Sequence, residues 1–305
     1  MKLAFNYPTG TYVVAVSGGV DSAVLLNVLV QQHPENSYIV ANVNHGIRKD
    51  SWQDTDVARS YANKYQLPFE YTELHLGSSA SEAEARAARY AFLKSVMNKH
   101  DAKAIITAHH QDDVIETMFI NVVRGTGRRG LSSLKTSNAL IRPMLTVPKS
   151  VIYSYAQQQK LVWIEDSTNN DTKYLRNFLR HKVVFNMDDQ QRSQALEIIN
   201  SATRINQLLD KELSHFVKAG LHKGGPVLNR RWFAQLPHNI ALEVMYIVLS
   251  TNGATDINRD MLERAVVAVK TMRPGKTIQL SGGEITFTKR SARIKVHRKT
   301  DENTV

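Results

Sequence analysis

Short apolar runs rich in β-branched residues alternate with helix-like segments in the first third of this chain, and this alternation limits the fold most. The runs are TYVVAV (11–16), YIVANV (38–43), FEYTEL (69–74) and AIITA (104–108). Strands separated by helices of this length form βαβ units, which predict an α/β fold with a parallel sheet and helices on both faces. Ligands of such sheets bind beyond the carboxyl ends of the strands, so the residues after these runs are the first candidates for a site.

The rest of the chain predicts a second, smaller domain. Residues 148–160 and 171–186 are predicted helices that close a first domain of residues 1–186. Apolar residues at helical spacing predict one long amphipathic linker helix over 187–219. Residues 220–305 then form a mostly helical C-terminal domain with a short β element. Within it we expect helices at 238–251 and 258–270 and short strands between 278 and 296.

Charge and cysteine content narrow the class of protein. The net charge of +11 is spread over both predicted domains and favours a polyanionic partner, although generic surface charge explains it equally well. The chain contains no cysteine, which excludes disulfides, Cys-ligated metal sites and thiol chemistry of its own. With no signal-like start and no run of 18 apolar residues, we expect a cytoplasmic protein that does not bind membranes.

The first predicted strand is followed by a loop suited to phosphate. Its sequence is Ser17-Gly18-Gly19-Val20-Asp21-Ser22, and the helical run AVLLNVLV follows. Small residues let backbone N–H groups close on phosphate oxygens, and the helix N-terminus adds positive potential. The loop is not a Walker A motif, because no G-x-x-x-x-G-K-[ST] occurs. A glycine-rich turn with an Asp or Ser cap is the alternative interpretation.

A second polar segment, TAHHQDDVIET (107–117), directly follows the fourth predicted strand. On a helix, His109 and Asp113 are four residues apart and Asp113 and Glu116 three apart, so we expect all three on one face. Paired carboxylates suit magnesium, and they also suit holding or deprotonating a cationic amine. Acidic residues that complement the helix dipole are the alternative, which accounts for Glu116 less well.

Basic and polar segments elsewhere have ordinary structural explanations when each is taken alone. After the second strand, NVNHGIR (42–48) includes Asn44 and His45, and SEAEARAARY (81–90) is a good helix former with Arg86 and Arg89. RGTGRRG (124–130) is a basic loop, and WIEDSTNNDTKYLRNFLRH (163–181) ends in a capped helix. Near the C-terminus, basic residues alternate with apolar ones and should line one sheet face.

Taken in order, six segments within residues 12–181 resemble the tRNA(Ile)-lysidine synthetases, which are PP-loop (N-type) ATP pyrophosphatases of Rossmann-like fold. Ser167 stands where that family commonly has proline. The resemblance implies that free L-lysine is ligated to the cytidine at the first anticodon position of isoleucine tRNA with a CAU anticodon. An adenylated cytidine would form first, and ATP with Mg²⁺ would give lysidine, AMP and pyrophosphate. A homodimer is also implied.

The resemblance assigns roles to individual residues. It implies Asp21, Arg89, Asp113 and Glu116 as catalytic, the last three also binding lysine, and Asp21 and Asp113 as magnesium ligands. ATP would be bound by Ser17, Gly18, Gly19, Val20, Asp21, Ser22, Asn44 and His45. Contacts to tRNA are expected from Arg124, Arg128, Arg129, Arg176 and Arg180 and, from the basic C-terminal strand, Arg290, Arg293 and Lys295.

The sequence leaves two alternative functions open. The first is another PP-loop enzyme, such as a tRNA thiolase, a GMP synthetase or an NAD synthetase. Thiolases use cysteines to carry sulfur, and a glutamine-dependent synthetase needs a Cys nucleophile to supply ammonia; this chain has neither. The second is a nucleotide- and RNA-binding protein without turnover, for which Arg89, Asp113 and Glu116 would have no purpose.

Overall fold

The computed structural model describes residues 1, 3, 6–44, 46, 51–74, 82–165, 175–222, 226–254, 257–280 and 282–296. The chain divides into two compact units, Met1–Thr203 and Arg204–Val305. The division falls inside one long helix, α7 (Asp189–Gly220). The predicted domain limits at 186 and 219 stay predictions. In the described part of the chain, no helix is both long and apolar enough to cross a membrane.

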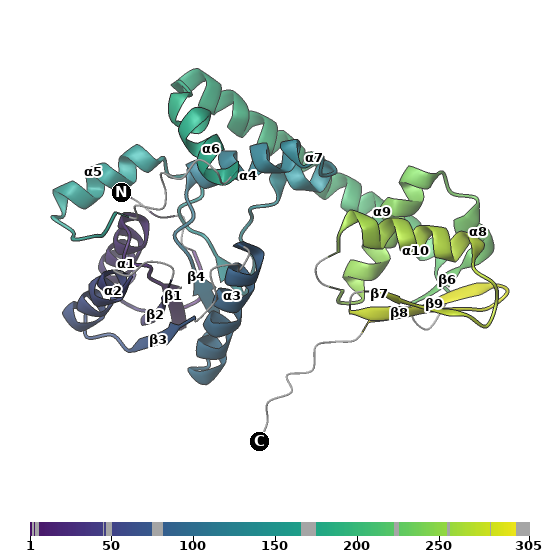
Figure 1. Ribbon diagram of the computed structural model, residues 1–305, viewed down its shortest axis with the longest axis horizontal. Helices are drawn as coiled ribbons and strands as arrows, with labels where there is room; N and C mark the ends of the chain where they lie inside the picture. The colour runs from purple at the N-terminus through teal and green to yellow at the C-terminus, as the bar shows by residue number, and fades with distance from the viewer. Residues whose placement is uncertain are drawn as a thin grey trace. The chain divides into compact units, whose positions relative to one another are not determined.

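A five-stranded parallel sheet forms the centre of the first unit (Figure 1). Its strand order is β3-β2-β1-β4-β5, so β1 lies between β2 and β4. The predicted α/β class is confirmed, and the four predicted strands are present. The two-residue β5 was not predicted, because so short an apolar pair carries no periodicity. The strands are β1 (Thr11–Ala15), β2 (Ser37–Asn44), β3 (Phe69–Glu73), β4 (Ala104–Ile106) and β5 (Leu140–Ile141).

Helices cover both faces of this sheet, which explains why its central strands β1, β2 and β4 are largely buried. Tyr12 and Val14 pack in a core with α1, α2 and α5, whereas Val13 and Ala15 pack with α3 on the opposite face. Successive side chains of a strand point to opposite faces, so both layers need buried residues. These helices are α1 (Val20–Gln32), α2 (Trp52–Lys64), α3 (Glu82–Lys99) and α5 (Lys149–Gln158).

A further helical layer follows β4. Its apolar core joins Ile115 and Met118 of α4 to Val184 and to Ala195 of α7. The helix predicted at 171–186 is observed as α6 and the 3₁₀ turn η3, while residues 171–174 lie outside the described residues. The elements of this layer are α4 (Gln111–Val123), η1 (Arg128–Ser132), α6 (Leu175–Lys182) and η3 (Val184–Asn186).

The second unit contains short helices and an antiparallel sheet of order β6-β9-β8-β7. Phe233 and Phe287 are buried in its core with residues of α9 and α10. The helices and strands predicted here are present, and the short β6 and α8 are additional. The elements are β6 (Val227–Asn229), α8 (Arg230–Ala234), α9 (His238–Thr251), α10 (Arg259–Thr271), β7 (Thr277–Leu280), β8 (Gly283–Phe287) and β9 (Ser291–Val296).

One face of β9 is basic and exposed. Arg293 and Lys295 are exposed, whereas Ala292 and Ile294 between them are buried in the core. This is the side-chain alternation that a half-buried strand requires.

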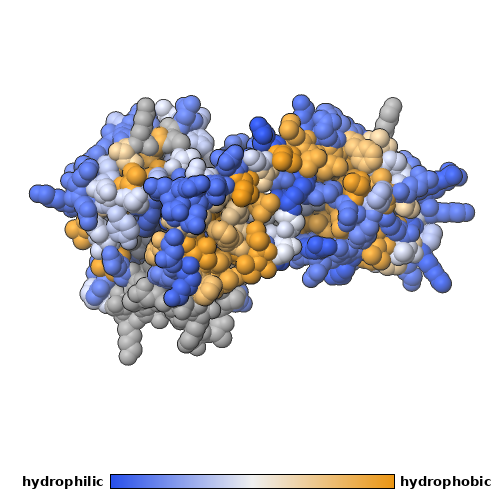
Figure 2. All heavy atoms as spheres, turned by 90° about the horizontal axis from the view of Figure 1, so that it is seen from above, coloured by the Kyte–Doolittle hydropathy of each residue, from blue (hydrophilic) through white to orange (hydrophobic). Residues whose placement is uncertain are grey.

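Apolar side chains also reach the surface, where Figure 2 shows them as patches among hydrophilic residues. Within the second unit, Ile205, Leu208 and Leu209 of α7 are exposed. Residues 205, 208 and 209 are three and four positions apart, so they form one apolar strip on this helix.

A buried amide connects three helical segments. Asn27 of α1 donates from Nδ2 to Tyr65 Oη at 2.7 Å, and its Oδ1 accepts from Tyr155 Oη of α5 at 2.8 Å. Tyr65 directly follows α2. Asn27→Ala removes both bonds and leaves two hydroxyl groups without this partner. We expect the free energy of unfolding to fall by about 1–3 kcal/mol, measured by urea denaturation.

Gln31→Ala is the matched control, because exposed Gln31 accepts a 3.2 Å bond from the same Tyr155 hydroxyl. It should change stability by less than about 0.5 kcal/mol. Equal effects of the two variants would show that Asn27 does not hold these helices together.

Candidate active site

The loop after β1 approaches α2 so closely that one position must be glycine. Gly18 has φ +90°, and a Cβ there would lie 2.5 Å from the Asp54 carbonyl oxygen. Ser22 Oγ accepts from Ser17 N at 3.1 Å and donates to Gly19 O at 2.9 Å, which closes the loop on itself. Gly19 is the N-cap of α1, and no described side chain caps this helix. The N–H groups of its first turn are therefore suited to an anionic ligand.

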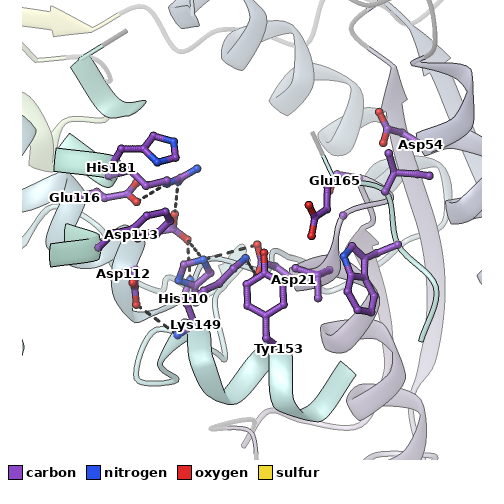
Figure 3. A pocket seen from close by; sticks show the side chains of 17 residues that line it. Asp21, Asp54, His110, Asp112, Asp113, Glu116, Lys149, Tyr153, Glu165 and His181 are labelled. Carbon is purple, nitrogen blue, oxygen red and sulfur yellow. Dashed lines mark hydrogen bonds and ion pairs between the residues drawn. The ribbon is translucent and has the colours of Figure 1, made fainter. Parts of the chain in front are cut away.

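The loop forms one end of a cavity of about 640 Å³. In Figure 3, His181 and Glu116 lie on one side of it, Glu165 and Asp54 lie on the other, and Asp21 lies between them. The walls come from segments far apart in the chain. Its lining includes Ser17, Gly19, Val20, Asp21, Asp54, His110, Asp112, Asp113, Glu116, Lys149, Tyr153, Trp163, Glu165, Arg180, His181 and Phe185.

Charged groups alternate in the middle of the cavity. Lys149 Nζ donates to Asp21 Oδ1 at 2.5 Å, and His110 Nε2 lies 3.7 Å from Asp21 Oδ2. The same His110 nitrogen lies 3.6 Å from Asp113 Oδ2. An imidazole therefore separates two carboxylates that would otherwise repel each other.

The deepest charged pair lies between α4 and α6. Arg180 Nε donates to Glu116 Oε1 at 2.6 Å, and Arg180 Nη2 donates to Glu116 Oε2 at 2.9 Å. Glu116 is only 1% exposed, so burial raises the pKa of its carboxyl group, and the bidentate bond from Arg180 opposes that rise. Arg180 Nη2 also lies 3.5 Å from Asp113 Oδ1, so one guanidinium holds both carboxylates.

Asp113 is held in its ionised form. Burial raises its pKa, but the His110 imidazole, the His110 N–H and Arg180 outweigh burial and keep the pKa below its usual range. Its Oδ2 accepts from His110 N at 2.9 Å, which also caps α4. Burial lowers the pKa of His109 to about 3, so this ring is neutral near pH 7. The cavity thus presents a carboxylate next to a phosphate-sized cradle.

The PP-loop domain model matches residues 2–187, more than half of the chain. The chain belongs to the PP-loop domain family. The loop from Ser17 to Ser22 and its helix N-terminus occupy the place, after the first strand, that motif and fold predicted.

Relatives of this PP-loop protein include tRNA(Ile)-lysidine synthases. One from Enterococcus faecalis is 39% identical over 189 residues, which cover 59% of this chain and 41% of that protein. One from Exiguobacterium sibiricum is 35% identical, over 60% of this chain and 45% of that protein. One from Shewanella woodyi is 30% identical, over 88% of this chain and 61% of that protein. The chain therefore spans about half the length of the relatives it matches.

A solved structure supports the fold of the PP-loop unit. The U34-tRNA thiolase NcsA from Methanococcus maripaludis superposes with a TM-score of 0.54 at 19% identity. The match covers 64% of this chain and 72% of that one. At this identity the likeness concerns the fold alone.

The structure brings only some of the predicted site residues of this PP-loop protein into the cavity. Arg176 contributes from α6, where its charge opposes the rise that burial causes in the pKa of Glu116. Arg89, with Arg86, lies near enough to His109 to lower its pKa. His45 lies outside the described residues. The predicted residues that line the cavity are Ser17, Gly19, Val20, Asp21, Asp113, Glu116 and Arg180; Gly18, Ser22, Asn44, Arg89, Arg124, Arg128, Arg129 and Arg176 are not in its lining.

Three basic residues predicted to contact tRNA belong to the second unit. Arg290 is exposed in the turn before β9, and Arg293 and Lys295 are exposed on β9 itself. Arg293 and Lys295 thus lie on the exposed face of β9, which is an inner strand of its sheet.

The expectation that His109, Asp113 and Glu116 share one helical face is wrong for His109. The helix α4 begins at Gln111 with His110 as its N-cap, so His109 precedes the helix. Its Nδ1 instead lies 2.9 Å from Thr107 Oγ1. His110 turns inward because Asp113 accepts its backbone N–H and thereby fixes the start of the helix.

The sequence did not identify Lys149 and Asp112, which line the cavity, or Arg192, which pairs with Asp112. Lys149 comes 128 residues after Asp21 and carries no motif, yet it pairs with it. Arg192 of α7 donates to Asp112 Oδ2 at 2.9 Å and to Val184 O at 2.6 Å. No signal in the sequence identifies these partners, since long-range pairing depends on tertiary structure.

Gly18→Ala should strain the loop, because alanine would need positive φ and would clash with the Asp54 backbone. We expect the free energy of unfolding to fall by about 1–3 kcal/mol, measured by urea denaturation. Gly19→Ala is the control: its Cβ would meet nothing closer than Ser17 Oγ at 3.7 Å. If Gly18→Ala were as stable as Gly19→Ala, the close approach to α2 would not require glycine.

Proposed function

We propose that this PP-loop protein is an ATP-dependent ligase that makes lysidine on isoleucine tRNA with a CAU anticodon. One observation carries the proposal. The phosphate cradle at Ser17–Ser22 and the Asp113–Glu116 pair line the same cavity. A nucleotide phosphate and a cationic amine can therefore be bound side by side. The relatives that are tRNA(Ile)-lysidine synthases support this function.

ATP binds with its phosphates against the first turn of α1. The N–H groups of that turn, which carry the positive end of the helix dipole, and the Lys149 ammonium supply the positive charge that a triphosphate needs. Lys149 would exchange its bond to Asp21 for a phosphate oxygen. Ser17, Gly18, Gly19, Val20 and Ser22 shape the loop. Asn44 is the last residue of the adjacent strand β2, and His45 is the next residue in the sequence.

Asp21 and Asp113 fit Mg²⁺, which takes one or two carboxylates and completes its shell with phosphate oxygens and water. Both carboxylates approach His110 Nε2 within 3.7 Å, so they face a common space. Among the described residues, no group of three or more His, Asp or Glu side chains could hold a metal ion, and Mg²⁺ does not need one. When bound, the ion would offset the charge on the departing pyrophosphate.

The reaction has two balanced steps. In the first, the cytidine O2 forms a bond to the α-phosphorus of ATP while the bond to the β-phosphate oxygen breaks, and pyrophosphate leaves. In the second, the ε-amine of L-lysine forms a bond to C2 of cytosine while the C2–O2 bond breaks, and AMP leaves with O2. The amine loses one proton before the attack and another after it.

Asp113 and Glu116 are suited to bind lysine and to accept its proton. Free lysine has an ε-amine pKa of about 10.4, so the amine arrives as an ammonium ion that cannot attack. The ionised Asp113 can hold that ammonium, and Glu116, whose pKa is raised by burial, is the stronger base of the two carboxylates. Arg180 fixes both carboxylates, and Arg89 approaches the same region beside His109. Arg89 is assigned to lysine binding on this basis.

Basic residues outside the cavity are proposed tRNA contacts. Arg124 is exposed at the end of α4, and Arg128 and Arg129 begin η1. A guanidinium can bind phosphate in a bidentate manner. Arg176 of α6, and Arg290, Arg293 and Lys295 of the second unit, complete this set. Arg180 is also a proposed tRNA contact, but it lines the cavity, where it pairs with Glu116.

We also propose that this protein is a cytoplasmic homodimer. Exposed Ile205 and Leu209 of α7 are equally distant from Gln207. If two copies of α7 cross antiparallel on the helix face opposite Gln207, Ile205 meets the partner's Leu209. Such a self-complementary strip suits a two-fold interface.

Asp113→Asn should remove lysidine formation while the protein stays folded. The asparagine Oδ1 can still accept the His110 N–H, but the side chain no longer carries the charge that holds the lysine ammonium. We expect transfer of radiolabelled lysine to CAU isoleucine tRNA, with ATP and Mg²⁺, to fall about 100-fold or more. Circular dichroism would check folding.

The exposed Asp56 on α2 provides the control, and Asp56→Asn should transfer lysine at the wild-type rate. Normal lysidine yield from Asp113→Asn would overturn the assignment of Asp113. Pyrophosphate release by the wild-type protein without lysine transfer would show that the acceptor is a different molecule.

Replacing both Ile205 and Leu209 by Asp should give monomers in sedimentation equilibrium, because two charges would be buried in the proposed interface. Val267→Asp changes an equally exposed valine of α10 and should leave the dimer intact. A wild-type protein that is monomeric at micromolar concentration would contradict the dimer.

A further inference from the structure

An exposed phenylalanine lies at the rim of the cavity, where its exposed ring adds little to the hydrophobic core. Phe185 is 54% exposed although its neighbour Val184 is fully buried. Both residues belong to the 3₁₀ turn η3, and Phe185 lines the same cavity as Asp113 and Glu116. Its ring lies 5.2 Å from the His181 ring at an angle of 89°. Two aromatic rings thus meet edge to face beside the reactive carboxylates.

This aromatic pair is held firmly in place. Val184 packs with Ile115 and Met118 of α4, and Arg192 donates to Val184 O at 2.6 Å. Asn186 Nδ2 donates to His181 O at 3.1 Å, which fixes η3 to the end of α6. A rigid aromatic side chain loses little entropy when a ligand stacks on it.

The end of α6, next to the pair, carries basic residues. The last turn of α6 consists of Arg180, His181 and Lys182, and Lys182 is exposed. Single-stranded nucleic acids bind where aromatic rings, on which bases stack, lie next to cations that contact the backbone phosphates.

The position of the pair indicates that its ligand is a base of the RNA and not the adenine of ATP. The phosphate cradle is formed by Gly19, Val20 and Asp21, and Figure 3 shows Asp21 apart from His181, with Asp113 and Glu116 on the side of His181. A planar group on Phe185 therefore enters beside the amine-binding carboxylates. That is the side on which the base that accepts lysine must be presented.

We infer that Phe185, with His181, is a stacking platform for an unpaired base of the tRNA anticodon loop. This inference rests on the proposed function and adds a base-binding site to it. Phe185 is a positioning residue, because it holds the base that reacts and takes no part in proton or phosphoryl transfer.

Phe185→Leu keeps an apolar side chain but removes the aromatic face. We expect the Kd for an isoleucine anticodon stem-loop, measured by fluorescence anisotropy, to rise about 5- to 100-fold, with the KM for ATP unchanged. Phe185→Trp should retain wild-type binding, which separates stacking from a general loss of structure. Phe178→Leu is the matched control, because Phe178 is also exposed on α6 but does not line the cavity.

A second measurement observes the base directly. Pyrrolocytidine at the first anticodon position should lose fluorescence on binding to wild-type protein and to Phe185→Trp, but much less on binding to Phe185→Leu. Unchanged stem-loop affinity and quenching in Phe185→Leu would overturn the inference. A higher KM for ATP with unchanged RNA affinity would overturn it too, because the ring would then contact adenine.

These outcomes differ from failure of the proposed function. If the wild-type protein transfers lysine but Phe185→Leu binds the stem-loop normally, only the stacking platform is wrong. If the stem-loop binds through Phe185 but no lysine is transferred, the platform stands and lysidine synthesis is wrong.

Discussion

The site depends on the parallel pairing of β1 with both β2 and β4. From β1 the chain continues to β2 and β3 on one side of the sheet, and to β4 and β5 on the other. The carboxyl ends of β1 and β4 therefore meet at the point where strand order reverses, and nothing of the sheet lies between them. This meeting puts the loop at Ser17–Ser22 next to the start of α4, although about ninety residues separate them.

Buried charges then fix α4 relative to the helices that follow it. Glu116 is paired with Arg180 of α6, and Asp112 is paired with Arg192 of α7. A buried charge that loses its partner costs several kcal/mol, so each pair strongly disfavours other arrangements of these helices. The same Arg180 also lies close to Asp113, so the residue that positions α6 also contacts the carboxylate that is proposed to bind lysine. Structure and proposed chemistry share these residues.

The pattern of residues close together along the chain was enough to predict most helices and strands and to find the main motifs. The apolar runs predict β1 to β4 because burial on both faces of the sheet favours apolar residues in its strands, and the helix predicted over 238–251 is observed as α9 with the same limits. Local pattern failed where a helix start was decided by one hydrogen bond: the Asp113 cap on His110 excludes His109 from α4. It also failed for β5, a two-residue strand that is defined by its parallel pairing with β4.

The sequence by itself determined the order of strands and helices, the glycine-rich loop and the acidic pair, because these depend on residues close together along the chain. Only the tertiary structure decided that Lys149 meets Asp21, that His110 lies between Asp21 and Asp113, and that Phe185 stands exposed at the cavity rim. These contacts join residues far apart along the chain or depend on which face of a short turn is buried. Side-chain periodicity carries no information about such pairs, since it reports the burial of a residue and not its partner.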